Sequence, residues 1–401
     1  MNSMRNIWLS YVLTLCRFSW FWLGIWIYFY LRFTNYTGIG LIETVLFVTT
    51  TVMEIPTGAI ADLLGKKKTL FVSFLLEVIG SLLMAYAKDM PMLSISVFIL
   101  AIGGALYSGT LEALVYDSLK ENGKIEQFAK VISNINSLQW FFPAICSVIG
   151  GFLYTIDPRL PFIVNGGVYG IGLVVTLFLS EPHVDTNKFS IAEFVKQTKS
   201  GFHQLMKSSF IVSHMILLLS VSTIMVLVNE MLDSMMSSEF GFTAIQIGIL
   251  WAVISTVAAV ASQLTPVITK IWGYRFSFVF FGYALGVSLL ISPLVGILLG
   301  GITLIFRSVF FAIFTNLSSV FIHSFTESRY RATTLSTYNM IKNIPYAITA
   351  IALGYASNLY TAKLVGFYLG LLICLLLSLQ LVISFQMKMI KVNKESLDLP
   401  Q

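Results

Sequence analysis

The chain has 401 residues and a formal net charge of +6; 57% of its residues are hydrophobic and only 11% are charged. Soluble domains carry roughly a quarter charged residues, so this composition excludes a soluble protein and indicates a multi-pass membrane protein. The positive charge does not indicate a nucleic-acid partner, because membrane proteins gather Lys and Arg on their cytoplasmic loops. The three cysteines, Cys16, Cys146 and Cys374, lie in apolar runs and match no metal site, so we expect no metal and no cofactor.

The apolar runs predict an all-α protein, because a membrane-spanning helix needs about 20 consecutive apolar residues. By this rule there are twelve transmembrane helices, at 6–32, 38–60, 69–87, 91–117, 128–154, 160–180, 208–236, 243–269, 276–291, 294–322, 332–356 and 363–385. The separation of the ninth helix from the tenth depends on Ser292-Pro293 alone. One kinked helix is the alternative there.

The distribution of basic residues supports this count. With both termini in the cytoplasm, eighteen Lys and Arg lie on the cytoplasmic side and four lie on the opposite side, namely Arg32, Lys88, Arg159 and Lys363. This is the positive-inside pattern of membrane proteins, and the loss of one span would reverse every later loop. We therefore expect a multi-pass protein of the cell membrane with cytoplasmic termini.

The longest connection, 181–207, divides the chain into two pseudo-symmetric halves. The N-terminal six-helix half is 1–180, the C-terminal half is 208–385, and a cytoplasmic tail follows at 386–401. Within the connection, Ser190 and Glu193 have the spacing of a capping box, and the apolar residues that follow fall mostly at helical spacing. The connection is either a helix on the inner membrane surface or an irregular tether.

The turn after the second span has a weak internal repeat. A shift of 208 residues places Leu64-Gly65-Lys66-Lys67 on Trp272-Gly273-Tyr274-Arg275, each between the second and third helix of its half. The second copy keeps the glycine and a base but has Lys270 in place of Asp62. Parallel repeats of six helices are an architecture of secondary transporters.

The segment Glu54–Lys68 carries the sharpest motif of the chain, G-x-x-x-D-x-x-G-K-K from Gly58 to Lys67. This motif, the two six-helix halves and the central linker together resemble the major facilitator superfamily of secondary transporters, with the bacterial drug-efflux members as the nearest pattern. The resemblance implies a fold of two six-helix halves that rock around a central site.

The resemblance also implies that the motif forms an inner gate. In the family the aspartate faces the start of the eleventh helix and the bases pair with an acid at the foot of the fourth. Here these positions are Asp62 with the segment Arg331–Thr334, and Lys66 and Lys67 with Asp117; the glycines are Gly58 and Gly65. The alternative is that the lysines only fix the topology.

This sequence departs in three places from the pattern of the drug-exporting members of the family. Leu63 occupies a position where the family usually has a base, and the run 103–109 lacks the arginine of drug antiporters. Pro143 also stands apart from Gly150-Gly151, so the antiporter motif of the fifth helix is degraded.

Charged residues inside the spans are the candidate site. Such residues cost several kcal/mol and usually face a cavity or a partner. In the resembled family helices 1, 4, 7 and 10 line the cavity, and all four carry a charge in this sequence: Arg17, Glu112, Glu230 with Asp233, and Arg307. Glu77 and Lys342 lie in spans three and eleven, where we expect packing against polar neighbours and an interface role.

Glu112 is the hypothesised proton-coupling carboxylate, with Arg17 tuning its proton affinity through charge proximity. The alternative is a permanent structural ion pair between Arg17 and Glu112. Arg307 either binds an anionic group of the substrate or pairs with Glu230. Glu230 and Asp233, three residues apart, should share one helix face.

A proton-coupled exporter of a small hydrophobic or amphiphilic compound is the function that the sequence favours. The aromatic content and the methionines of span seven, Met225, Met231, Met235 and Met236, favour an adaptable pocket, although simple packing is the alternative. Proton-coupled uptake of a nutrient (sugar, peptide or organic ion) and a transport-incompetent sensor are the other candidates. The sequence contains no GxxxxGK[ST], HExxH or GxSxG motif. We therefore expect that ATP does not drive the protein directly and that it is not an enzyme. The expected partners are the substrate, protons and the lipid bilayer, with a monomer implied by the resemblance.

Overall fold

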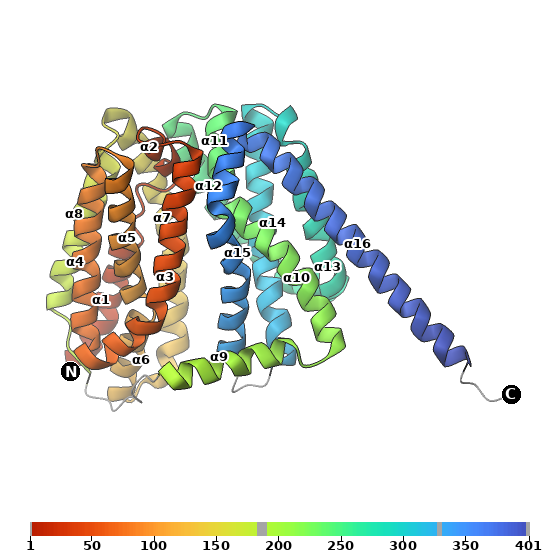
Figure 1. Cartoon of the computed structure of the whole chain (residues 1–401). Helices are drawn as coiled ribbons and strands as arrows, with labels where there is room; N and C mark the ends of the chain where they lie inside the picture. Colours follow the sequence, from red (N-terminus) through yellow and green to blue (C-terminus); the bar gives the residue numbers. More distant parts are fainter. Residues whose placement is uncertain (1, 183–190, 327–330, 398–401) are drawn as a thin grey trace.

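The computed structural model describes residues 2–182, 191–326 and 331–397. Within helices it leaves undescribed the side chains of residues 2–3, 54–56, 58–63, 191–195, 197, 209–210, 331–333, 336 and 383–397. Every regular element in the described ranges is a helix, which confirms the all-α prediction. Two bundles stand side by side, and both chain ends lie on the same face of the molecule (Figure 1). We call this the termini face and the other the far face.

The first bundle consists of α1 (Asn2–Arg17), α2 (Trp26–Tyr30), α3 (Tyr36–Leu64), α4 (Lys66–Ala85), α5 (Met90–Tyr107), α6 (Thr110–Glu121), η1 (Ile125–Gln127), α7 (Phe128–Ile156) and α8 (Leu160–Leu177). The linker contains α9 (Ile191–Leu205). The second bundle consists of α10 (Ser209–Leu227), η2 (Val228–Leu232), α11 (Asp233–Phe240), α12 (Ala244–Ser262), α13 (Thr265–Leu290), η3 (Ser292–Leu294), α14 (Ile297–Phe325), α15 (Arg331–Leu359) and α16 (Ala362–Leu397).

Ten helical segments in the described residues are long and apolar enough to cross a membrane, and they match ten of the twelve predicted spans. The first predicted span does not qualify because it is broken into α1 and α2. The eleventh, α15, is a continuous helix of 29 residues, but its first half carries the polar run TTLSTYN. At Ser292-Pro293 the short turn η3 separates α13 from α14, so two helices are present rather than one kinked helix.

The described part of the linker is the helix α9, as the first of the two alternatives for the linker predicted. α9 lies along the termini face (Figure 1) and packs against α15. Ser190 of the predicted capping box lies outside the described residues. α16 slants away from the bundle and runs to Leu397, so most of the predicted tail continues the last helix (Figure 1).

The turn that repeats between the halves has the same backbone conformation in both copies. Gly65 has φ +89° and ψ 151°, and Gly273 has φ +66° and ψ 171°. Side chains with a Cβ rarely adopt this conformation, which explains why both copies keep glycine. Gly273 interrupts α13, so the turn between the eighth and ninth predicted spans lies inside that element. The shared conformation supports the internal repeat.

The two bundles meet tightly on the far face, where α3 packs against α15 and α7 packs against α12. Glycines allow backbone to touch backbone there, as is common between membrane helices. A Cβ on Gly40 would overlap the carbonyl of Ala350, and one on Gly354 would overlap the carbonyl of Tyr36. On the other helix pair, a Cβ on Gly151 would lie 2.5 Å from the carbonyl oxygen of Ala244.

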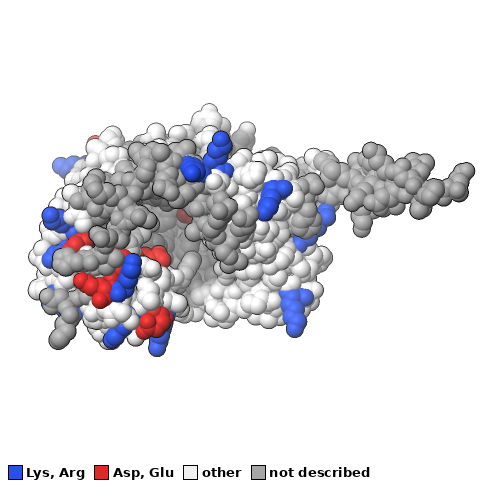
Figure 2. All heavy atoms as spheres, turned by 90° about the horizontal axis from the view of Figure 1, so that it is seen from below, with Lys and Arg blue, Asp and Glu red and all other residues white. Residues whose placement is uncertain are grey.

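Hydrogen bonds between the bundles lie near the same face. Tyr28 donates to the carbonyl of Phe242 at 2.8 Å, and Asn358 Nδ2 donates to Thr37 Oγ1 at 2.7 Å. The termini face, by contrast, is hollowed near its centre, with acidic side chains gathered on one side of the hollow (Figure 2). The described bundles are therefore joined on the far face and open toward the termini face.

Candidate functional site

Three of the four helices predicted to line the cavity are interrupted close to their charges. The first span stops being helical after Arg17 and resumes at Trp26. The fourth breaks at Gly109, with φ +73°, three residues before Glu112. The seventh contains the π-helical turn Val228–Leu232, which includes Glu230. Interrupted helices and π-turns in membrane transporters often accompany binding sites.

The break in the first span is held by side chains and by close backbone contact. Ser19 Oγ donates to the carbonyl of Cys16 at 2.7 Å, and the Phe21 N–H donates to Asn165 Oδ1 on α8 at 3.3 Å. A Cβ on Gly150 of α7 would overlap the carbonyl of Phe21. Non-helical backbone at membrane depth is stable only where protein or water satisfies it, and here α7 and α8 supply much of that contact.

Arg17 forms a buried ion pair with Glu77 of α4. The Nε to Oε1 distance is 2.6 Å, and the side chains are 17% and 1% exposed. The guanidinium carbon also lies 5.5 to 5.9 Å from the ring centroids of Phe18, Trp20 and Tyr107. Rings at this distance add cation–π attraction to the ion pair.

The predicted proximity of Arg17 to Glu112 is therefore wrong. Glu112 is exposed, and Arg17 points to α4 because two glycines of α5 leave room for the pair. A Cβ on Gly103 would lie 2.8 Å from Glu77 Cγ, and one on Gly104 would lie 2.8 Å from Arg17 Nη2. For Glu77 we expected only packing against polar neighbours, and the glycine pair of α5 is the sequence signal for its closer partner. The coupling role of Glu112 stays a prediction, without the argument from Arg17.

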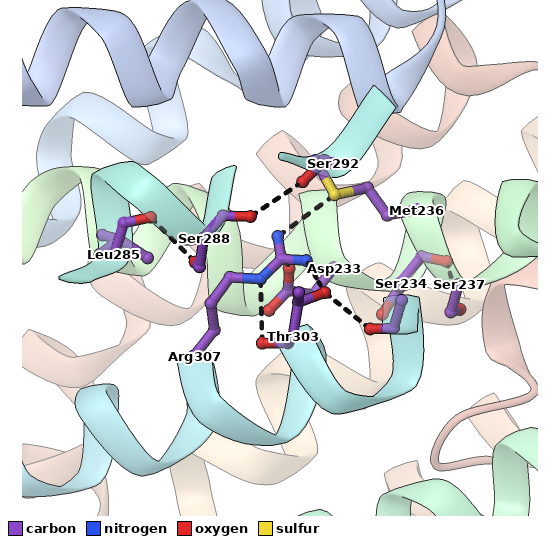
Figure 3. Close-up of polar contacts among 10 residues, drawn as sticks. Asp233, Ser234, Met236, Ser237, Leu285, Ser288, Ser292, Thr303 and Arg307 are labelled. Carbon is purple, nitrogen blue, oxygen red and sulfur yellow. Dashed lines mark hydrogen bonds and ion pairs between the residues drawn. The ribbon is translucent and has the colours of Figure 1, made fainter. Parts of the chain in front are cut away.

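Arg307 of α14 forms the second buried ion pair, with Asp233 at the start of α11 (Figure 3). Arg307 Nη1 lies 2.7 Å from Asp233 Oδ1, and the two side chains are 1% and 6% exposed. Arg307 also donates from Nη2 to Thr303 Oγ1 at 3.2 Å and from Nη1 to Met236 Sδ at 3.2 Å. This cluster joins helices of the second bundle only.

The alternative in which Arg307 pairs with Glu230 is also wrong. The π-helical turn replaces i→i+4 hydrogen bonds with i→i+5 bonds, so Glu230 and Asp233 no longer share one face as their spacing predicted. Asp233 meets Arg307, whereas Glu230 accepts from Asn229 Nδ2 at 3.2 Å and lies within electrostatic range of Lys342 on α15.

Glu43 of α3 is a buried acid that was not among the residues predicted from the sequence. It is 7% exposed, and its Oε2 accepts a hydrogen bond from the hydroxyl of Tyr346 on α15 at 3.0 Å. Glu43 lies inside the predicted span 38–60, so the rule that drew attention to the other intramembrane acids would have found it. Unlike the two ion pairs, this contact joins the two bundles.

Of the gate motif, the structure describes the contacts of Gly65, Lys66 and Lys67. Lys66 Nζ lies 2.6 Å from Asp117 Oδ2, which is the pairing that the family resemblance implied. Lys67 instead donates to the carbonyl of Leu177 at 2.8 Å. Gly58 and the side chains of Asp62 and Arg331 lie outside the described side chains, so their predicted roles stay predictions.

A carboxylate that the sequence analysis did not single out caps the helix after the motif. Glu181 accepts from the N–H groups of Lys66 and Lys67 at 2.7 and 2.8 Å. Helix N-termini have unpaired N–H groups and a partial positive charge, which favour a carboxylate there. Glu239 caps α16 in the same way, through the N–H groups of Ala362 and Lys363 at 2.6 and 3.0 Å.

Replacing Glu181 with Ala should lower the free energy of unfolding by about 1 kcal/mol, because loss of a helix cap typically costs that much. Equilibrium unfolding of the purified protein in mixed micelles would measure the change. Glu126→Ala is the matched control, because Glu126 is an exposed acid in the same bundle. Equal stability of the two variants would contradict a capping role for Glu181.

Two helical bundles with a connecting linker, interrupted helices and buried charges define the fold of a membrane transporter. The family model described as Major Facilitator Superfamily matches residues 7–350, so the chain belongs to this superfamily and is a multi-pass membrane protein.

Comparisons with individual proteins agree with this family. The chain is 24% identical over 182 residues to the "Uncharacterized MFS-type transporter YxaM" of Bacillus subtilis (strain 168), covering 43% of this chain and 45% of that protein. It is 26% identical over 229 residues to the "Multidrug resistance protein MdtL" of Shewanella sp. (strain ANA-3), covering 57% and 53%. The matches thus span about half the length of these relatives.

Solved structures resemble the chain over nearly its whole length. The nucleoside transporter NupG superposes with a TM-score of 0.77 at 14% identity, covering 95% of this chain and 98% of that one. A POT family transporter in complex with a thioalcohol-conjugated peptide superposes with a TM-score of 0.68 at 15% identity, covering 95% and 96%. At these identities the likeness shows the fold alone.

Proposed function

We propose that the chain is a secondary transporter that works by alternating access and exports a small hydrophobic or amphiphilic compound in exchange for protons. The observation that carries the proposal is the one-sided contact between the bundles. Hydrogen bonds join them on the far face, whereas the termini face is hollowed near its centre (Figure 2). One end state of alternating access has this asymmetry. We also propose that the halves 1–180 and 208–385 move as units, and that a monomer acts in the cell membrane with both termini in the cytoplasm.

The state of the buried charges supports an amphiphilic substrate. Arg17 and Arg307 are each neutralised by an acid of their own bundle, so neither offers an unpaired charge to an anionic substrate. Aromatic rings surround Arg17. The chain is also similar to a protein named for multidrug resistance, and export of drugs is one route to such resistance.

The methionines of the seventh span do not add to this support. Met231, Met235 and Met236 are fully buried, so in this conformation they pack against neighbours. Met236 also accepts a hydrogen bond from Arg307. Simple packing, the alternative to an adaptable pocket, therefore accounts for them here.

Proton-coupled uptake of a nutrient is the second candidate function. The structural neighbours include a nucleoside transporter and a POT family transporter with a bound peptide conjugate, which suggests nucleosides and peptides as compounds to test. Because these similarities show the fold alone, they support the candidate less directly than the charge pairing supports export.

Flux into liposomes that enclose a pH-sensitive dye would separate the two candidates. The panel should contain lipophilic cations, nucleosides and dipeptides, each added outside. Exchange for protons makes the lumen more alkaline, whereas symport makes it more acidic. Alkalinisation with lipophilic compounds supports export, acidification with nucleosides or peptides supports uptake, and no proton movement with any compound contradicts both.

In the same assay, Asp62→Asn should slow transport several-fold while leaving the affinity for the transported compound nearly intact. The resemblance assigns Asp62 to the gate rather than to the binding site, so its loss should alter the rate of conformational exchange. Lys68→Gln is the control, because Lys68 is an exposed base that directly follows the motif. A large loss of affinity in the Asp62 variant would contradict the gate role.

A further inference from the structure

We propose that Glu43 is a proton-binding site that links protonation to closure of the far face. The inference rests on the proposed alternating access and names a residue through which protons would drive it. No family motif discussed above contains Glu43.

Glu43 lies in the contact that closes the far face. Its carboxyl accepts from Tyr346 on the opposite bundle, and the next residue, Thr44, donates to the carbonyl of Ala347 at 3.2 Å. One turn earlier along α3, Gly40 touches the backbone of α15. Separation of α3 from α15 must therefore break the Glu43–Tyr346 hydrogen bond and expose the carboxyl to water.

The partners of Glu43 differ from those of the other buried acids. Glu77, Asp117 and Asp233 each lie within 2.7 Å of a Lys or Arg nitrogen. In the part of the chain that the structure describes, Glu43 has only the Tyr346 hydroxyl as a bonded partner and no ion pair. Tyr346 of α15 contacts Glu43, Tyr30 of α2 and Glu230 of η2 lie within electrostatic range of it, and Lys342 of α15 lies within electrostatic range of Glu230. α5, which also packs against α3, has no charged residue.

These surroundings favour a neutral carboxyl while the far face is closed. An ionised carboxylate buried without a cation costs several kcal/mol, and a second carboxyl nearby adds repulsion. Binding one proton from water forms the carboxylic O–H bond and removes this cost. When α3 and α15 separate, water hydrates the carboxyl, the charged form becomes acceptable, and the proton leaves to water on the far face.

The sign of the pH dependence follows from this cycle. The closed state binds one more proton than the open state, so acid favours closure and base favours opening. Between the ionisation ranges of the two states, the ratio of closed to open molecules should fall by up to tenfold per pH unit.

Distance measurements between spin labels would test this. The labels belong at Lys88→Cys and Tyr360→Cys, which are exposed and lie at the far-face ends of the two bundles. Cys16, Cys146 and Cys374 are first replaced by Ser or Ala. Pulsed electron–electron double resonance on the full chain in liposomes should show a population with a short distance between the two labels. This population should dominate in acid and shrink as the pH rises.

Substitutions identify the responsible group. Glu43→Gln, which keeps the acceptor oxygen without the charge, should hold the short distance at every pH. Tyr346→Phe should reduce the short-distance population roughly 2- to 10-fold at a given pH, because it removes one hydrogen bond. Glu126→Gln, at an exposed acid outside the candidate site, should keep the pH dependence. Retention of the pH dependence in Glu43→Gln, its loss in Glu126→Gln, or an unchanged profile in Tyr346→Phe would each overturn the proposal.

The same measurement separates this inference from the proposed function. Two distance populations whose pH dependence survives Glu43→Gln would overturn the role of Glu43 and leave alternating access intact. A single distance at every pH in the wild type and in all variants would overturn alternating access as well.

Discussion

Replacing Arg307 with Met is expected to lower the free energy of unfolding by about 3–5 kcal/mol, because breaking a buried ion pair leaves an uncompensated charge. Asp233 would lose its partner at 2.7 Å while remaining 6% exposed. Thr303 and Met236, which accept hydrogen bonds from Arg307, would lose their donor as well.

Equilibrium unfolding in mixed micelles would measure this loss. Arg159→Met is the matched control, because Arg159 is an exposed arginine at the N-terminus of α8 and should change stability by about 0.5 kcal/mol or less. The double variant Arg307→Met with Asp233→Leu should recover much of the loss, since replacing a buried ion pair by apolar side chains is often neutral. Equal stability of the Arg307 and Arg159 single variants would show that the pair is not a structural requirement.

Replacing Gly354 with Ala should lower the ratio of molecules closed on the far face to molecules open on it by roughly 5- to 150-fold. The added methyl group would overlap the backbone of Tyr36, and overpacking of a tight contact costs about 1–3 kcal/mol. The cost arises only while α3 and α15 are in contact. The substitution should therefore alter the conformational equilibrium more than the fold.

Alkylation of a Thr44→Cys variant by a water-soluble maleimide would report this shift, because Thr44 lies at the contact with Ala347. The rate should rise in the Gly354 variant, in a background without the natural cysteines. Gly170→Ala is the matched control, since a Cβ at Gly170 meets no atom within 4 Å. Identical alkylation rates in the two variants would mean that the glycine contact does not limit opening.

The sequence was a good guide to the helices that are continuous and apolar. Ten spans could be located from hydropathy, because burial in lipid requires an apolar run of a set length. The break after Arg17 could not be located in this way, since the residues that hold it, Asn165 and Gly150, lie far away in the chain. α15 is also long enough to cross a membrane, but the polar run TTLSTYN in its first half makes it less apolar than the other ten segments. As a whole this helix packs against α3 and α9.

The charges of the site were recognised more readily than their partners. Arg17, Asp233 and Arg307 were identified because an ionisable group at membrane depth needs a reason to be there. Their pairings depend on which face each helix turns toward its neighbour. The glycines of α5 direct Arg17 to Glu77, and a π-helical turn directs Asp233 to Arg307. Spacing along a single helix contains neither kind of information.

The gate motif was the region where resemblance helped most. The Lys66–Asp117 ion pair joins α4 to α6 and was expected only because the family has such a pair. The cap that Glu181 places on α4 was not foreseen, because Glu181 lies in the linker, beyond the last predicted span of its half. No sequence pattern indicates which helix end will be capped by an acid that lies between the N-terminal half and the linker.

The interruption of the first span has a consequence for how the protein is made. α1 and α2 have 16 and 5 residues, each shorter than the membrane is thick, and α1 ends on an arginine. When these residues leave the ribosome, neither Glu77 nor the α7 and α8 contacts that hold the break have been synthesised. The translocon therefore receives residues 6–32 as an apolar run in which Arg17 is still unpaired, and the break after Arg17 can form only once helices translated later supply its partners. Biogenesis of the N-terminal half is in this sense a joint event of several helices rather than the successive release of independent ones.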